Sequence, residues 1–193
     1  MWLAVDPASH TGYVTNFGEH TVSVIDTRHC HAGDTSGCAS QTPPAVSVAN
    51  ATGPLAITVD HATSTAYVTD TTFTFSPGAM SLINIRHCHA GDTSGCGQTP
   101  ATIPLPAGIG SSVHIDYATN AVYVANLNDS SVSVIDGRRC NASNMSHCRP
   151  TRKIEVGSNP SDLTIDPQND TVYVPNFFDN DASVFPTFKS PPG

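Results

Sequence analysis

A fourfold internal repeat constrains the fold of this chain more than any other feature. In each copy an apolar run ends in Asp, and a Tyr-Val pair follows seven residues later and leads to Asn or Asp. The copies are Leu3–Asp6 with Tyr13–Asn16, Ile57–Asp60 with Tyr67–Asp70, Val113–Asp116 with Tyr123–Asn126, and Leu163–Asp166 with Tyr173–Asn176. They recur at intervals of 54, 56 and 50 residues. One structural unit is therefore repeated along the chain.

Each unit continues with more short segments of β-branched residues. A third segment occurs at residues 22–26, 81–85, 132–136 and 182–185, and a fourth at residues 45–48, 101–105 and 152–156. Thr and Ser number 42 in the 193 residues, whereas Glu and Lys number two each. This composition favours strands over helices. The sequence predicts an all-β chain whose units contain four short strands, a to d. The alternation in Val22-Ser23-Val24 and Val132-Ser133-Val134 predicts one buried and one solvated face.

A four-stranded sheet of this size cannot bury its faces alone, but several stacked radially can, as in a β-propeller. We expect residues 1–193 to form one β-propeller domain of four-stranded antiparallel blades, with units near residues 3–54, 55–112, 113–162 and 163–193. Four units suggest part of a larger ring. A self-contained four-bladed ring, or two chains that complete an eight-bladed one, are the alternatives. No leader is visible before the first strand, which fits a piece of a longer chain as well as a cytoplasmic protein.

The repeat also resembles a known family. Tyr13-Val14-Thr15-Asn16, preceded by Leu3-Ala4-Val5-Asp6-Pro7 and followed by Thr21-Val22-Ser23-Val24-Ile25-Asp26, is similar to the repeat of YVTN-repeat (YncE-like) β-propellers, and the likeness covers essentially the whole chain. The resemblance implies a propeller of usually about seven blades, so the four units are expected to be part of a larger, seven- or eight-bladed ring. It also implies a protein that is often extracytoplasmic, in a family whose members mostly have no known activity. The catalytic motifs of quinoprotein-like, lactonase or lyase propellers find no matching positions here.

Six cysteines form three pairs of spacing C-x7-C, each between strands c and d: Cys30/Cys38, Cys88/Cys96 and Cys140/Cys148. The even count and the placement of one pair per unit predict three local disulfides, each worth roughly 2–3 kcal/mol. A zinc site is the alternative, because His29, His31 and Asp34 flank the first pair. However, the third insertion keeps its two cysteines but has neither of the histidines that flank Cys30. We expect disulfides, no metal, and a secreted, periplasmic or cell-surface location.

Two regions are candidates for ligand binding. The first is the set of turns between strands b and c, called the rim here, where aromatic residues stand beside carboxylates and amides. Its candidate residues are Asn16, Phe17, Glu19, His20, Asp70, Phe73, Asn126, Asp129, Asn176, Phe177 and Asp179. The recurrence of Asn16, Asp70, Asn126 and Asn176 favours a turn-capping role for these four. The second region is the channel side of strand a, where His114 replaces the Ala or Thr of the other units.

Two further repeated positions have structural explanations. Asp6, Asp60, Asp116 and Asp166 begin the a–b turns and suit turn chemistry better than a ring of carboxylates. Tyr13, Tyr67, Tyr123 and Tyr173 are expected to pack between blades.

The function hypothesis that the sequence favours is a non-catalytic extracytoplasmic binding or scaffold module for a protein, glycan or small ligand. An enzyme of lactonase or lyase type, using a channel metal or His114, is the alternative. Nucleic-acid binding is disfavoured, because Lys and Arg number eight and the net charge is −8. No Walker, Rossmann, Gly-x-Ser-x-Gly or haem-attachment motif occurs, so no cofactor is predicted. No apolar run could span a membrane. Self-association and further blades in a longer parent chain both remain open.

Overall fold

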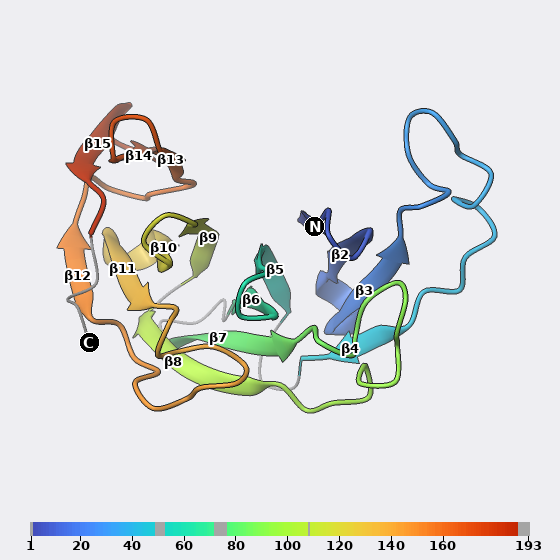
Figure 1. The fold of residues 1–193 in the computed structure, drawn as a ribbon. Coiled ribbons are helices and arrows are strands. Elements are labelled where there is room, and N and C mark those ends of the chain that lie inside the picture. Colours follow the sequence, from blue (N-terminus) through green and yellow to red (C-terminus); the bar gives the residue numbers. More distant parts are fainter. Residues whose placement is uncertain (1, 49–52, 72–76, 108, 189–193) are drawn as a thin grey trace.

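The computed structural model describes residues 2–48, 53–71, 77–107 and 109–188. These residues form four antiparallel sheets that follow one another around an open arc (Figure 1). Three sheets have four strands and the last has three. The predicted all-β propeller architecture is therefore confirmed.

The strands of each sheet follow the chain order. The first sheet contains β1 Leu3–Asp6, β2 Thr11–Asn16, β3 Thr21–Asp26 and β4 Ala45–Ser47, and the second contains β5 Pro54–Asp60, β6 Thr65–Asp70, β7 Pro77–Asn84 and β8 Ala101–Ala107. The third contains β9 Gly110–Asp116, β10 Ala121–Asn126, β11 Ser131–Asp136 and β12 Arg152–Glu155, and the fourth β13 Thr164–Asp166, β14 Thr171–Asn176 and β15 Asp181–Pro186. Two 3-10 turns, η1 Phe17–Glu19 and η2 Leu127–Asp129, join strands b and c of the first and third sheets.

The first strand of each sheet lies on the inner side of the arc. β5 and β9 face its centre, whereas β8 and β12 lie outside (Figure 1). Contacts run from β1 to β5, from β5 to β9 and from β9 to β13. Strand a is thus the channel strand, as a propeller requires.

The strands differ from the expected pattern at two places. The second and third sheets begin at Pro54 and Gly110, before the repeat motifs, because both strands extend past a bulge in their pairing with strand b. The solvated face predicted for Val132-Ser133-Val134 is also wrong, since Ser133 is fully buried. A neighbouring sheet covers each face of the third sheet, and the Ser133 hydroxyl accepts a hydrogen bond from Asn126 Nδ2 at 2.9 Å.

The hydrophobic core lies between the sheets as three separate layers. Each layer combines the tyrosine and strand c of one sheet with strands a and b of the next. Tyr13, Tyr67 and Tyr123 are fully buried in successive layers, which confirms the predicted packing role for these three. Tyr173 in the fourth sheet is 37% exposed.

The repeated aspartates hold the a–b turns, as predicted. Asp6 Oδ1 accepts the Ala8 N–H at 3.1 Å and its Oδ2 accepts the Ser9 hydroxyl at 2.6 Å. Asp60 and Asp116 form the same pair of bonds, with Ala62 and Thr63 and with Ala118 and Thr119. Asp166 accepts the Gln168 N–H at 2.8 Å.

Candidate functional site

The rim turns share one backbone form. In the first, third and fourth sheets the residue just before strand c has a positive φ: 56° at His20, 47° at Ser130 and 55° at Asn180. The chain at the start of the third and fourth turns is tied to the loop before strand a, because the N–H groups of Leu127 and Phe177 donate to Ile109 and Asn159 carbonyls. The rim is therefore a set of braced turns, and Phe73 of the second turn lies outside the described residues.

Three of the repeated rim residues point back into their own sheet. The amide Nδ2 of Asn126 donates to the Ser131 and Ser133 hydroxyls at 3.1 and 2.9 Å. Asn16 bonds Thr21 and Ser23 in the same way, and Asn176 bonds Asp181 and Ser183. Asn126 and Asn176 are 1% exposed. These side chains fix the turn through strand c side chains, rather than through the backbone bonds that capping would use.

Asp70 occupies the same position in the second sheet with a carboxyl in place of an amide. Its Oδ2 accepts the Ser81 hydroxyl at 2.6 Å, and its Oδ1 has no partner among the described residues. The residue is 1% exposed. Burial raises the pKa of the Asp70 carboxyl from 3.8 to about 6, and the Ser81 bond opposes part of this rise.

The remaining rim candidates differ in what they offer to a ligand. The Asp129 carboxylate already has two partners within the chain, since its Oδ2 lies 3.0 Å from Lys153 Nζ and accepts the Ser131 hydroxyl at 2.7 Å. Phe17 packs over Gly53, and a Cβ on Gly53 would come within 2.8 Å of the Phe17 ring. Glu19 and His20 are exposed.

Among the described rim residues, those of the fourth turn carry the most exposed aromatic surface. Phe177 and Phe178 are each 66% exposed, and their ring centroids lie 5.5 Å apart. Asp179 is exposed beside them and its Oδ2 accepts the Ser158 N–H. Phe177 and Asp179 are among the candidates predicted from the sequence, whereas Phe178 is not, although two adjacent aromatics in a turn are a visible signal.

His114 lies on the channel strand β9, as the sequence predicted, and it has a partner that the sequence did not reveal. His114 Nε2 lies 3.5 Å from Asp162 Oδ1, and the two side chains are 40% and 49% exposed. Asp162 Oδ1 also accepts the Ser112 hydroxyl at 2.6 Å. Asp162 belongs to the loop before β13, so this pairing depends on contact between the third and fourth sheets. Within the described residues, no three His, Cys, Asp or Glu side chains gather closely enough to hold a metal ion.

The cysteine insertions form three disulfides, Cys30–Cys38, Cys88–Cys96 and Cys140–Cys148. These are the predicted pairs. The thiolates that the zinc alternative requires are therefore absent in the oxidised chain. Three disulfides are typical of proteins outside the cytosol.

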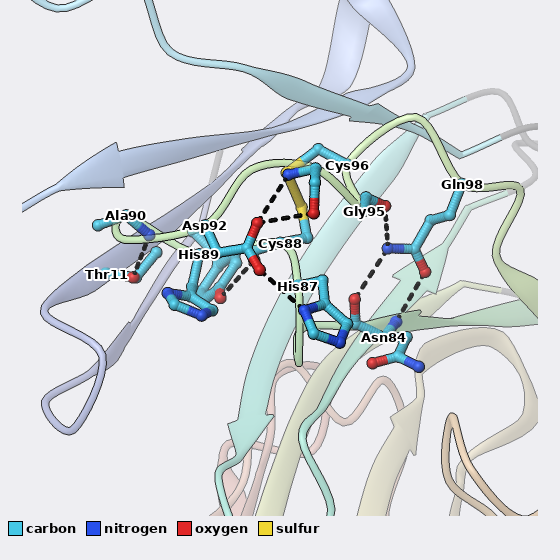
Figure 2. The surroundings of a disulfide bond; sticks show 12 residues. Thr11, Asn84, His87, Cys88, His89, Ala90, Asp92, Gly95, Cys96 and Gln98 are labelled. Atoms are coloured by element: carbon cyan, nitrogen blue, oxygen red, sulfur yellow. Dashed lines mark hydrogen bonds and ion pairs between the residues drawn. A yellow bond between two sulfur atoms is a disulfide. The ribbon is translucent and has the colours of Figure 1, made fainter.

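Each of the first two insertions is braced by a His–Asp pair, and Figure 2 shows the pair of the second insertion. His87 Nδ1 lies 2.8 Å from Asp92 Oδ2, and Asp92 Oδ1 accepts the Ser94 hydroxyl at 2.7 Å. His29, Asp34 and Ser36 repeat this arrangement. Bonds from the serine hydroxyl and then the histidine hold the pKa of Asp34 and Asp92 well below its usual range. These histidines serve the loop and do not converge with His114.

No protein-family model and no curated protein matches the sequence. Many solved structures resemble it, including the following two. Kuenenia stuttgartiensis hydrazine synthase superposes with a TM-score of 0.64 at 15% identity, over 98% of this chain and 50% of that one. A chain of a mitotic checkpoint complex superposes with a TM-score of 0.68 at 11% identity, over 97% of this chain and 48% of that one. Both contain β-propellers.

The chain has a β-propeller fold. At such low identities the likeness concerns the fold alone. The chain spans about half the length of these two solved chains. The described residues include no helix long and apolar enough to cross a membrane.

Proposed function

We propose that this chain is a non-catalytic binding or scaffold module of an extracytoplasmic β-propeller of the YVTN-repeat type. The three disulfides support a location outside the cytosol. The Tyr-Val-Thr-Asn motif and its three variants support the family. The ligand class is a protein segment, a glycan or a small molecule that binds at the rim.

The observation that carries this proposal is the aromatic pair on the fourth rim turn. Exposed apolar surface with polar groups beside it is typical of binding sites, because water leaves it readily when a partner stacks on it. The backbone of Phe177 and Phe178 is already ordered, because their N–H groups donate to the Asn159 and Ser158 carbonyls at 3.0 and 3.3 Å. Ordering the backbone therefore costs little upon binding.

Binding measurements on a panel of cell-wall glycan fragments and peptides test the proposal. The double variant Phe177→Ala/Phe178→Ala is expected to weaken binding of any ligand found by at least about tenfold, the loss of about 1.4 kcal/mol. Tyr117→Ala is the matched control, because Tyr117 is 72% exposed and follows β9 in an a–b turn, at the opposite end of the strands. Equal affinity in the double variant and the wild type would contradict rim binding.

The contact between His114 and Asp162 favours one second candidate, an enzyme of lactonase or lyase type. A histidine oriented by a carboxylate on a channel strand can act as a general base. Turnover of lactone substrates that is lost in His114→Ala and reduced in Asp162→Asn would support it. Activity unchanged by both substitutions would exclude His114 as the base.

A further inference from the structure

The sheets join through one interface that is repeated along the chain. In the first copy, Tyr13 Oη donates to the Cys88 carbonyl at 2.9 Å, and the Ala90 N–H donates to Thr11 Oγ1 at 2.8 Å (Figure 2). In the second copy, Tyr67 Oη donates to the Cys140 carbonyl at 2.8 Å, and the Ala142 N–H donates to Thr65 Oγ1 at 2.9 Å. The Thr-x-Tyr motif of one strand b thus receives the cysteine insertion of the next sheet.

In the third interface the buried tyrosine hydroxyl also has a main-chain partner, but there it accepts a hydrogen bond instead of donating one. Tyr123 Oη accepts the N–H of Phe188, which follows strand β15, at 2.8 Å. All three buried tyrosine hydroxyls therefore bond a main-chain group that comes from a later unit. A buried hydroxyl without such a partner would destabilise the interface.

Apolar side chains complete each interface in equivalent positions. The tyrosine and the strand c residue opposite it lie on one side, and two strand a residues of the next sheet lie on the other. In the first two interfaces these are Tyr13 and Val24 with Ile57 and Val59, and Tyr67 and Leu82 with Val113 and Ile115. All eight are at most 6% exposed.

The fourth sheet presents one half of this interface at the end of the arc. Thr171, Tyr173 and Val184 stand where Thr65, Tyr67 and Leu82 stand in the second sheet. Tyr173 is 37% exposed and Val184 57% exposed. Within the described residues, the Tyr173 hydroxyl has no hydrogen-bond partner.

The first sheet presents the other half at the opposite end of the arc (Figure 1). Leu3 and Val5 stand where Ile57 and Val59 stand in the second sheet, but they are 58% and 49% exposed. The insertion of the first sheet, residues 28–38, has the same eleven residues as residues 86–96. It therefore offers Cys30 and Ala32 in place of Cys88 and Ala90.

The first insertion already has the conformation in which the second insertion docks on the first sheet. The Gly37 N–H donates to the His29 carbonyl at 2.7 Å, as Gly95 donates to His87 at 2.7 Å. Both disulfides have a Cα–Cα distance of 4.8 Å. Binding to this surface thus requires little ordering of the loop.

We propose that a second copy of this chain docks its first sheet on the fourth sheet of the first copy. Tyr173 Oη donates to the partner's Cys30 carbonyl, and the partner's Ala32 N–H donates to Thr171 Oγ1. Leu3 and Val5 of the partner pack on Tyr173 and Val184. The two surfaces differ, so the contact is heterologous, and a second identical contact closes two copies into one ring of eight sheets. This inference does not depend on ligand binding at the rim.

Sedimentation of the oxidised chain, with two charge variants, tests the proposal. Wild type is expected to sediment as two chains. Val5→Arg and Val184→Arg each place a charge in one half of the contact, so each variant alone sediments as a single chain. Both side chains are about half exposed in the single chain, so the fold tolerates the substitutions, and an unchanged circular dichroism spectrum checks this.

A mixture of the two variants separates this arrangement from any other. The fourth sheet of Val5→Arg and the first sheet of Val184→Arg are both intact, so the mixture regains one contact and forms a mixed two-chain species. A symmetric contact between identical faces would not be restored by mixing. A single-chain wild type, a dimer that survives both substitutions, or a mixture that stays single would each overturn the proposal.

Discussion

The second sheet and the fourth sheet have nearly the same repeat motif but different surroundings. Tyr67 in the second sheet is fully buried, and its hydroxyl bonds the Cys140 carbonyl. Tyr173 in the fourth sheet is 37% exposed. The difference comes from the neighbour, because the third sheet covers Tyr67 and no described sheet covers Tyr173.

The two identical insertions lead to the same conclusion. Cys88 and Cys96 are buried, whereas Cys38 is exposed. The local bonds within the two loops match. The loop sequence thus determines its own conformation, and docking on a preceding sheet determines its burial. Stability in a repeat protein accordingly resides in the contacts between units as much as in the units themselves.

Truncating the tyrosines should show the largest difference between the two sheets. Tyr67→Ala is expected to lower the free energy of unfolding by about 3–5 kcal/mol, since it removes a fully buried aromatic ring and a buried hydrogen bond. Tyr173→Ala should cost less than about 1 kcal/mol, because its ring already contacts water. Urea unfolding measures both. Both variants are made in the Val5→Arg background, which is expected to prevent a second copy from covering Tyr173.

Equal losses for the two variants would mean that contacts between sheets contribute little. In that case each sheet would be stable through its own hydrogen bonds. Phe178→Ala, which changes a side chain that is 66% exposed on a rim turn, provides the baseline for ring removal.

The sequence predicted more of the fold than of the candidate site, for a physical reason. Strands, sheets and disulfides depend on local patterns, such as the interval from Asp6 to Tyr13, that recur in every unit. The pairing of His114 with Asp162 joins two sheets across 48 positions, and no spacing rule predicts it. The burial of Ser133 similarly depends on sheets that cover both of its faces.

Removing the second disulfide should be the next largest effect. Both loops close over the same sequence separation of eight residues, so loss of either disulfide costs roughly 2–3 kcal/mol through the unfolded state. Cys88→Ser/Cys96→Ser also places hydroxyls where both sulfurs are buried, so its loss should exceed that of Cys30→Ser/Cys38→Ser. Chemical denaturation of the two double variants measures the difference. Identical losses would show that docking adds nothing to the loop.

Asp70 shows how burial of a rim carboxyl makes the free energy of unfolding depend on pH. Burial raises its pKa from 3.8 to about 6, so the folded state holds the proton more tightly than the unfolded state. The resulting stabilisation is complete below about pH 4 and is lost as the pH rises through about 6. Asp70→Asn, which copies Asn126 of the third sheet, should remove this pH dependence. The variant should be more stable than wild type above pH 6, by at most about 3 kcal/mol.

Melting temperatures of wild type and Asp70→Asn between pH 4 and 8 measure this effect. The two curves should converge at the acidic end and separate as the pH rises. Asn126→Asp is the reverse substitution and should introduce the same pH dependence in the third sheet. A constant offset between Asp70→Asn and wild type at every pH would mean that the Asp70 carboxyl does not titrate in this range.

The smallest effect isolates a single hydrogen bond between sheets. Thr11→Val leaves the partly buried Ala90 N–H without its acceptor, whereas Thr171→Val leaves no described group unpaired across an interface. Both threonines also donate to a carbonyl in their own turn, Ser9 and Asn169 respectively, so this local loss cancels in the comparison. Thr11 Oγ1 in addition lies 2.9 Å from the Ser9 hydroxyl, which keeps its 2.6 Å bond to Asp6 Oδ2 in the variant. In the Val5→Arg background, Thr11→Val should therefore cost about 1 kcal/mol more than Thr171→Val. Amide hydrogen exchange should report the same change locally, as faster exchange at Ala90 with little change at Ala142, whose acceptor Thr65 is intact.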